Sequence, residues 1–368
     1  MLKLRTILVA FALLSILEGC KVDSSQDAGQ KDDFDRAAML IFWADEIIIP
    51  AYQDYHLKTK ALQQSFADYR ANPSLSTEES LRLAFANGYK SWQWVSAFAI
   101  GPAESMSLLN YSNIFPCDTT ELLAAIVNPN LNLSLPSTFD IQGWPALDFL
   151  LYGSNPDSAF HQLQSNPERL QYLQILCDRL ESLARSVLEG WTSTYRSSFV
   201  SSTGSGADAA TNKLINDFVF NYEKELRAAK IGIPAGVFSG SPLPSRLEAY
   251  FSDTLSKSLY REALAAQRAF FEGRSFSSDQ IGPSLQNYLD YLQVSHNGEM
   301  LSTKIINQFK QVETLAAALP TSFKQTIKSN PAPFLQSYDA LQQNVIWLKV
   351  DMMQALNVRV DYVDADGD

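Results

Sequence analysis

The sequence is poor in the side chains that usually bind transition metals. Its 368 residues include only three histidines and three cysteines. The histidines His56, His161 and His296 are widely separated, and no H-E-x-x-H motif is present. The cysteines also lack the close spacing of metal ligands. The sequence therefore assigns no metal site of the usual histidine and cysteine type.

Basic residues are in the minority as well. The chain has 29 Lys and Arg against 40 Asp and Glu, with a net charge of −11 at pH 7. An acidic surface of this kind argues against nucleic acid as a partner, because phosphates need basic patches. Signals of a catalytic nucleophile are missing too, since there is no G-x-S-x-G segment and no spacing that suggests a Cys–His pair.

Long apolar runs are absent after the N-terminus, so no later segment is expected to span a membrane. The first twenty residues have the pattern of a bacterial lipoprotein signal. Lys3 and Arg5 precede a short apolar core at residues 7–17, and Leu17-Glu-Gly-Cys20 resembles a lipobox. An ordinary cleaved signal followed by a chance cysteine is the alternative.

If the lipobox is functional, residues 1–19 are removed and Cys20 carries the lipid. Residues 20–35 are polar and predict a flexible tether. Lys21 follows Cys20 with no aspartate that would suggest inner-membrane retention. We therefore expect a protein that is anchored in the outer membrane of a Gram-negative cell and faces the periplasm. Other envelope proteins are its expected partners.

The remaining cysteines, Cys117 and Cys177, leave two alternatives open. The cell envelope permits disulfide bonds, so the two residues could form a bridge. Cys177 lies within an apolar helical stripe, which favours two free thiols.

Helical periodicity dominates the rest of the chain. Apolar residues from Leu170 to Trp191 recur at steps of three and four, and Pro167 stands near the start of this run. Comparable runs occupy residues 37–71, 77–97, 211–229, 247–259, 301–318 and 341–356. Helices of this length joined by short turns pack as antiparallel bundles, so the sequence predicts an all-α fold.

The small, polar segment at residues 201–207 divides these runs into two groups. We predict an N-terminal helical bundle over residues 36–200 and a C-terminal bundle with an acidic tail over residues 209–368. The alternation of apolar residues from Val358 to Tyr362 predicts a short strand or an extended tail.

One segment, Gly143-Trp-Pro-Ala-Leu-Asp-Phe-Leu-Leu-Tyr-Gly153, resembles the G-x-H-x-x-E signature of the imelysin family. Gly143 matches that signature, whereas Pro145 stands at the histidine position and Asp148 at the glutamate position. Four other segments are similar to the family in the same order; they begin at Ile47, Phe98, Lys230 and Leu348. The resemblance implies two helical bundles in an envelope protein, with relatives linked to peptidase activity or to iron uptake.

Proline at the histidine position decides which of these functions is favoured. Pro145 has no side-chain donor for a metal, and Asp148 alone makes a poor zinc site. We therefore expect a non-catalytic ligand-binding or interaction protein with a link to iron or haem acquisition. A metal-dependent peptidase and a purely structural envelope scaffold are the alternatives. No cofactor is assigned, although a divalent cation remains an option.

The residues expected to contact a ligand come from three of the family-like segments, and each has a structural alternative. Asp148 could simply stabilise the positive end of its helix. Trp144 could belong to the core, and Lys230 could belong to a rigid connection rather than face Glu104 or Asp148. His296-Asn-Gly-Glu299 has a ligand-like spacing, but Asn297-Gly298 favours a turn. The predicted ligand-binding residues are Gly143, Trp144, Pro145, Asp148, Glu104 and Lys230.

Overall fold

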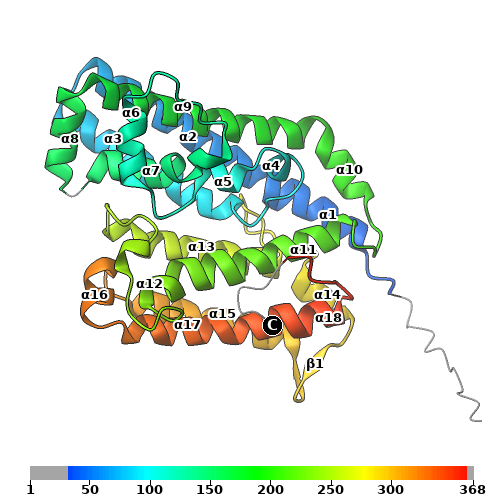
Figure 1. The fold of residues 1–368 in the computed structure, drawn as a ribbon. Coiled ribbons are helices and arrows are strands. Elements are labelled where there is room, and N and C mark those ends of the chain that lie inside the picture. The colour runs from blue at the N-terminus through cyan, green and yellow to red at the C-terminus, as the bar shows by residue number, and fades with distance from the viewer. Residues whose placement is uncertain (1–31, 154, 363–368) are drawn as a thin grey trace, which may run out of the picture. The chain divides into compact units, whose positions relative to one another are not determined.

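The computed structural model describes residues 32–153 and 155–362, and nearly all of the regular secondary structure in this part of the chain is helical (Figure 1). The predicted signal peptide, Cys20 and most of the predicted tether lie outside the described residues, as do residues 363–368. The described residues from Asp35 onward belong to one compact unit. The predicted all-α class with two helical bundles is confirmed.

The first bundle forms the upper layer of helices in Figure 1, called the first layer below. Its central helix α2 packs against both α3 and α9. The elements of the first layer are α1 (Arg36–Phe42), η1 (Trp43–Ile48), α2 (Ile49–Ala71), α3 (Leu75–Val95), α4 (Pro102–Ser105), α5 (Leu108–Ser112), α6 (Thr119–Ile126), η2 (Pro136–Ile141), α7 (Gly143–Tyr152), α8 (Pro156–Ser165), α9 (Pro167–Gly190), η3 (Trp191–Tyr195) and α10 (Arg196–Ser201).

The second bundle forms the lower layer in Figure 1, called the second layer below. Within it, α17 packs against α15 and η4, and α13 packs across the boundary against α3 of the first layer. The elements of the second layer are α11 (Ala210–Phe220), η4 (Asn221–Gly232), α12 (Ile233–Ala235), η5 (Pro244–Arg246), α13 (Thr254–Glu272), α14 (Leu285–Tyr291), β1 (Ser295–His296), β2 (Glu299–Met300), α15 (Leu301–Ala318), α16 (Phe323–Ser329), α17 (Ala332–Val345), η6 (Ile346–Met352) and α18 (Met353–Ala355).

The long helices form where the apolar spacing predicts them. Helix α9 begins at Pro167, whose missing N–H costs nothing at the first helical position. The side chain of Asn166 accepts a hydrogen bond from the N–H of Arg169 at 2.9 Å and so caps the helix start. The apolar stripe from Leu173 to Val187 is buried, and its burial against α2 supplies most of the driving force for this packing.

The predicted helix over residues 247–259 is wrong in its first half. Helix α13 begins only at Thr254. Ala249 has φ +54° and Asp253 has φ +51°, which is left-handed backbone that an α-helix cannot contain. The segment between them is a turn whose backbone N–H groups bind a carboxylate of the first layer, as shown below.

The chain end up to Tyr362 is extended and forms no strand with the rest of the described residues. It lies along α11, where the side-chain amide of Asn216 donates to the carbonyl of Arg359 at 2.9 Å. The oxygen of the same amide accepts from the N–H of Asp361 at 3.1 Å. Of the two predicted alternatives, the extended tail is the one observed.

The predicted turn at Asn297-Gly298 is confirmed. Both residues have positive φ, +52° and +80°, and they connect β1 to β2 as a two-residue hairpin. Nδ1 of His296 lies 3.1 Å from Oδ2 of Asp351. His296 therefore faces a helix of the second layer and is remote in the fold from the signature segment.

Cys117 and Cys177 are free thiols, so the alternative of a disulfide bond between them is wrong. In the described part of the chain, no helix has the length and apolar character needed to cross a membrane. The chain passes from the first layer to the second between Ser201 and Ala210. The domain limits predicted at residues 36–200 and 209–368 stay a prediction.

Candidate functional site

The glycine of the signature segment is required by a close contact between backbones. Gly143 begins α7 with φ +73°. A Cβ atom at this position would lie 2.2 Å from the carbonyl oxygen of Ser112. Both the backbone conformation and the space therefore exclude larger residues. Gly143 positions α7 and contributes no side chain to a ligand.

Trp144 belongs to the core of the first layer. Its side chain is fully buried and stacks on Tyr89 with the ring centroids 5.4 Å apart. Its indole Nε1 donates to the hydroxyl of Tyr55 at 3.3 Å. On the other side, a Cβ atom at Gly88 would lie 2.5 Å from the indole ring. This packing leaves no room for a ligand to touch Trp144.

Asp148 joins the two layers. Its side chain is 1% exposed, and its two oxygens accept hydrogen bonds from the backbone N–H groups of Phe251 at 2.8 Å and Ser252 at 3.0 Å. Burial raises the pKa of Asp148 to about 6, although these hydrogen bonds act in the opposite direction. The carboxylate thus binds the backbone of the second layer instead of the N–H groups at the start of its own helix.

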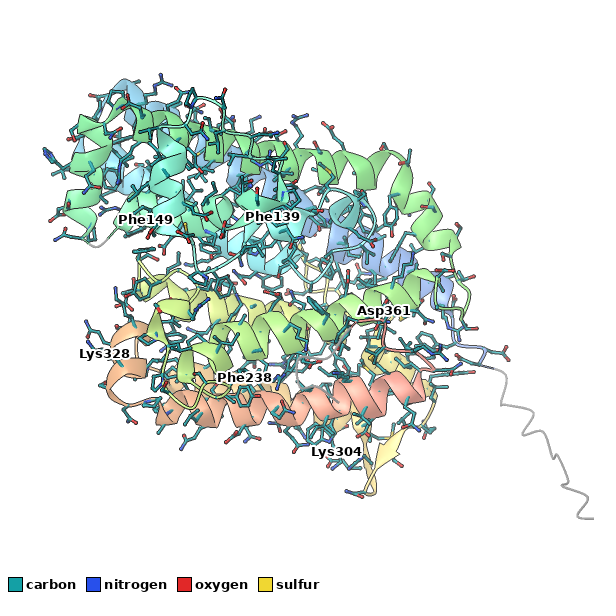
Figure 2. All side chains as sticks on the ribbon, viewed as in Figure 1. Phe139, Phe149, Phe238, Lys304, Lys328 and Asp361 are labelled. Carbon is teal, nitrogen blue, oxygen red and sulfur yellow. The ribbon has the colours of Figure 1, made fainter. Side chains whose placement is uncertain are left out.

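A cavity of about 310 Å³ adjoins Asp148 and is named here the Pro145 pocket. Three aromatic residues, Phe115, Tyr250 and Phe251, form much of its wall. Phe149 lies on the side of the first layer that faces the second (Figure 2). It supports this wall, since its ring centroid lies 5.1 Å from that of Phe251. The lining residues come from both layers and are Phe115, Pro116, Cys117, Thr119, Pro145, Asp148, Ser245, Arg246, Leu247, Ala249, Tyr250 and Phe251.

The charges around this pocket have both signs: the carboxylates of Asp118 and Asp140 lie close enough to Cys117 to raise its pKa, whereas the exposed charged residue of the lining is a cation. Arg246 is exposed and lines the cavity. Nζ of Lys324 lies 4.1 Å from the ring centroid of Tyr250. Cys117 is a protonated thiol at neutral pH, because burial raises its pKa to about 12. The lining of the pocket therefore combines aromatic surface with one exposed cation, and it has no reactive thiolate.

Lys230 lies behind this pocket in a buried polar network. Its ammonium group donates to Oε2 of Glu248, and both side chains are almost completely buried. Oε1 of Glu248 accepts from Gln93 at 3.1 Å and from Asn113 at 2.8 Å. Asn113 accepts in turn from the hydroxyl of Tyr89 at 2.7 Å. The partner of Lys230 is therefore Glu248, and not Glu104 or Asp148, the two carboxylates of the functional alternative.

Glu104 lies elsewhere. It is exposed on α4 and close enough to Asp217 and Asp361 to influence both carboxyl groups. Burial, followed by the negative charges of Glu104 and Asp361, raises the pKa of Asp217 to about 7. Of the six predicted ligand-binding residues, the structure brings only Pro145 and Asp148 to the same cavity.

The histidines are also distant from the Pro145 pocket. Nε2 of His56 lies 3.0 Å from Glu181 on α9, and His161 is exposed on α8. Within the residues that the structure describes, no three His, Cys, Asp or Glu side chains are grouped so that they could hold a metal ion. At the signature itself, Pro145 offers no donor atom and both oxygens of Asp148 already accept backbone hydrogen bonds. These residues do not fit a zinc or iron centre.

The sequence reasoning missed the residues of the turn, above all Glu248, Phe251 and Ser252. Their spacing is helical, so the sequence predicts one continuous helix there. A signal was available in Ser252-Asp253-Thr254, because Ser, Asp and Thr are the residues that commonly precede a helix. That pattern places the helix start at residue 254 and leaves the preceding residues free for a turn.

Comparison with known families agrees with this architecture. The family model described as Imelysin (Peptidase M75) matches residues 48–346, which is most of the chain. The chain belongs to the imelysin family. The match spans the signature segment, the turn at residues 249–253 and the Lys230–Glu248 pair.

Individual relatives are distant in sequence but similar in fold. This imelysin is 22% identical over 299 residues to "Iron-regulated protein A" of Synechococcus elongatus, covering 78% of this chain and 77% of that protein. The crystal structure of a putative iron-regulated protein A precursor from Parabacteroides distasonis superimposes with a TM-score of 0.70 at 17% identity, covering 86% of this chain and 94% of that one. An imelysin-like protein from Psychrobacter arcticum gives 0.69 at 18% identity, with 89% and 96% coverage.

Proposed function

We propose that this imelysin is a non-catalytic binding protein and that the Pro145 pocket is its binding site. The observation that carries the proposal is the state of the signature carboxylate. Both oxygens of Asp148 accept backbone N–H groups of the second layer, and Pro145 replaces the imidazole. The pocket is therefore built to hold its two walls together and to receive a ligand, and it lacks a group that would activate water.

The lining defines the kind of ligand. A volume of about 310 Å³ is at the lower end of the range for small-molecule sites. Aromatic rings favour a flat apolar group, and Arg246 together with Lys324 favours negative charge. Haem has both an aromatic ring system and carboxylate groups. An edge of haem that carries a carboxylate is the iron-linked ligand that suits this lining best.

The link to iron is supported by the names of the relatives. Two of the similar proteins are called iron-regulated protein A or its precursor. Those names describe the relatives, and here they only guide the choice of ligands to be tested. Haemin, iron(III) citrate, zinc and calcium are the appropriate set.

Titration calorimetry with each of these compounds, supported by the absorbance change of haemin, tests the proposal. We expect haemin to bind and zinc and calcium to give no heat. Arg246→Gln should weaken haemin binding about tenfold, because a charge-assisted hydrogen bond is lost. Arg70→Gln, at an exposed arginine on α2, is the matched control and should bind normally. Equal affinities for the two variants, or no binding at all, would remove the proposal.

The alternative, a metal-dependent peptidase, requires a metal that activates water. A digestion assay on casein, with and without a chelator and with Asp148→Ala as a variant, distinguishes it from the binding protein. Cleavage that is abolished both by the chelator and by the variant would establish the peptidase. The binding protein predicts no cleavage in any of these samples.

Anchoring at the cell envelope completes the proposal. Cys20 carries a lipid after removal of residues 1–19, and the protein faces the periplasm from the outer membrane, where other envelope proteins are its partners. Metabolic labelling with a radioactive fatty acid checks this step. Label should appear in the wild-type protein and be absent from Cys20→Ser, with Cys117→Ser as the matched control.

A further inference from the structure

A second and larger cavity lies in the first layer, away from the Pro145 pocket. Its volume is about 710 Å³, and one wall is the exposed side of α9. The opposite wall is the end of α6 with the loop that follows, at residues 127–133. We call this cavity the α9 groove. The two cavities share no lining residue, so they can be tested independently.

The groove is elongated along the helix. Its α9 residues include Glu168, Tyr172, Ile175 and Arg179, which fall at helical steps of three and four and therefore on one face. The eleven-residue separation between Glu168 and Arg179 corresponds to about 16 Å along the helix axis, at 1.5 Å per residue. A long, narrow ligand suits this geometry better than a compact one.

The middle of the groove is apolar and open to solvent. The side chain of Val127 is 68% exposed and that of Ile175 is 37% exposed. On the loop side the groove is also lined by Leu131, which is partly exposed, and by Leu133, which is buried. Because α9 packs on α2 through its other face, the packing of the helix does not require an apolar surface here. A ligand that covered this surface would gain hydrophobic free energy roughly in proportion to the area covered.

The loop wall is held in place by hydrogen bonds. The side-chain amide of Gln142 donates to the carbonyl of Leu133 at 2.9 Å. The N–H of Ser134 donates to the side-chain oxygen of Asn132 at 3.0 Å, which shapes the adjacent turn. The groove is therefore formed before a ligand arrives, and binding does not have to order the loop.

One end of the groove has a cation whose neighbours are neutral. Nε of Arg179 donates to the side-chain oxygen of Gln142 at 2.5 Å, and Nη2 donates to the carbonyl of Leu133 at 2.9 Å. The guanidinium group also lies 4.5 Å from the ring centroid of Tyr111. That ring is packed in turn by Phe139, with centroids 4.8 Å apart.

Arg179 forms no ion pair with any carboxylate of the described residues. Burial lowers its pKa from the ordinary value for arginine, which is the effect of a partly desolvated charge that lacks an opposite charge. An anionic group bound at this end would supply the missing charge and would gain a charge-assisted hydrogen bond.

We propose that the α9 groove binds a long-chain monocarboxylate, with the carboxylate at Arg179 and the apolar chain along Ile175 and Val127. The opposite end of the groove fixes the direction of binding. Glu168 lies there, exposed in the first turn of α9, and its negative charge repels the carboxylate from that end. The chemistry that is recognised is one negative charge joined to one extended apolar chain.

Binding of cis-parinaric acid, a fluorescent long-chain monocarboxylate, to the purified protein tests the proposal. We expect saturable fluorescence enhancement below the micellar concentration, displacement by palmitate, and binding of parinaric acid methyl ester that is at least about tenfold weaker. Ile175→Asp should abolish the enhancement, because it places a carboxylate in the apolar path. Leu57→Asp is the matched control, since Leu57 is 62% exposed on α2 and lines neither cavity.

The role of the cation is tested by Arg179→Gln, with the far-ultraviolet circular dichroism and melting temperature measured to verify that the loop remains folded. Affinity should fall about tenfold for the acid and remain unchanged for the ester. Equal binding of acid and ester to the wild type would overturn the proposal, as would full affinity in a folded Ile175→Asp variant. Arg246→Gln should leave this binding intact, which separates failure here from failure of the haem proposal.

Discussion

Among the polar links that cross from the first layer to the second, two are built from different chemistry. In one link, the carboxylate of Asp148 accepts two backbone N–H groups. In the other, Glu248 accepts the ammonium group of Lys230 together with the amides of Gln93 and Asn113. Both links end on the same short segment, at residues 248–252. Together they fix the turn that forms one wall of the Pro145 pocket.

The difference lies in how each buried charge is compensated. Glu248 faces a full positive charge and two neutral donors, whereas Asp148 faces neutral N–H groups and a more distant Lys324. Asp217 is a third case, because its neighbours Glu104 and Asp361 are themselves negative. Within one fold, the negative charge of a buried carboxylate is therefore balanced by a cation at Glu248, balanced only by neutral donors and a distant cation at Asp148, and opposed by other negative charges at Asp217.

The largest effect is expected when the compensated pair is broken. Glu248→Ala leaves the ammonium group of Lys230 buried without its counter-charge, which should cost about 3–5 kcal/mol of unfolding free energy. Urea denaturation followed by circular dichroism measures this loss. Glu189→Ala removes one partner of an exposed pair with Arg185 and should cost less than about 1 kcal/mol. Similar losses for both variants would show that Lys230 finds another acceptor.

A smaller loss is expected for Asp148→Asn at pH 8. The amide keeps a single acceptor oxygen and turns an NH2 group toward a backbone N–H donor, so one of the two hydrogen bonds is replaced by a repulsive contact. We expect a loss of about 2–3 kcal/mol. Asp208→Asn, at an exposed aspartate, serves as the control for the substitution itself. A neutral result for Asp148→Asn would mean that the turn does not depend on this link.

Asp217→Asn, in contrast, is expected to increase the unfolding free energy. The pKa of Asp217 is about 7 in the folded protein, against 3.8 for an ordinary aspartate, so the folded state binds the proton more tightly. Wild-type stability should therefore fall as the pH rises through this interval, with the loss complete above about pH 7. The neutral amide avoids that loss and should add about 1–2 kcal/mol at pH 8, after allowance for solvent screening.

The pH dependence of this variant provides its own control. At pH 4 the folded wild-type protein already has a neutral Asp217, so the advantage of Asp217→Asn should be much smaller there. Urea denaturation at pH 4 and pH 8 measures both values. A variant that is equally stabilising at both pH values would show that packing, and not charge, is responsible.

The smallest effect is expected for Pro145→His, which restores the missing imidazole of the signature. We predict no measurable zinc binding by calorimetry, because the oxygens of Asp148 remain occupied by Phe251 and Ser252 and one imidazole is an insufficient ligand set. The wild-type protein titrated in the same buffer is the reference. Stoichiometric zinc uptake by the variant would mean that Asp148 leaves its backbone partners for a metal.

The parts of the fold that were predictable depend on local patterns. Apolar spacing predicted α9 and α15, because each helix buries a stripe that its own sequence displays. The turn at residues 249–253 was not predictable in this way. Its residues Phe251 and Ser252 are held by Asp148, about a hundred positions earlier in the chain, and a single sequence does not display such a contact.

The residues of the candidate site likewise fall into those that the sequence predicts and those that it does not. Pro145 and Asp148 were found because they stand within a recognisable segment, and they do share a cavity. Glu104 and Lys230 were grouped with them on family order alone. The fold places Glu104 beside Asp217 and pairs Lys230 with Glu248. Order along the chain therefore indicated the family, while the partners of each charge depended on packing between layers.

The contact between Gly88 and Trp144 limits which amino-acid substitutions these two positions can accept. The indole ring occupies the space that any side chain at position 88 would need. Gly88→Ala alone should destabilise the fold through a steric clash with the indole ring, and Trp144→Phe alone should destabilise it by leaving a void. In the double variant, the methyl group at position 88 fills the space that the smaller ring at position 144 leaves. Substitutions at these two positions are therefore expected to be correlated.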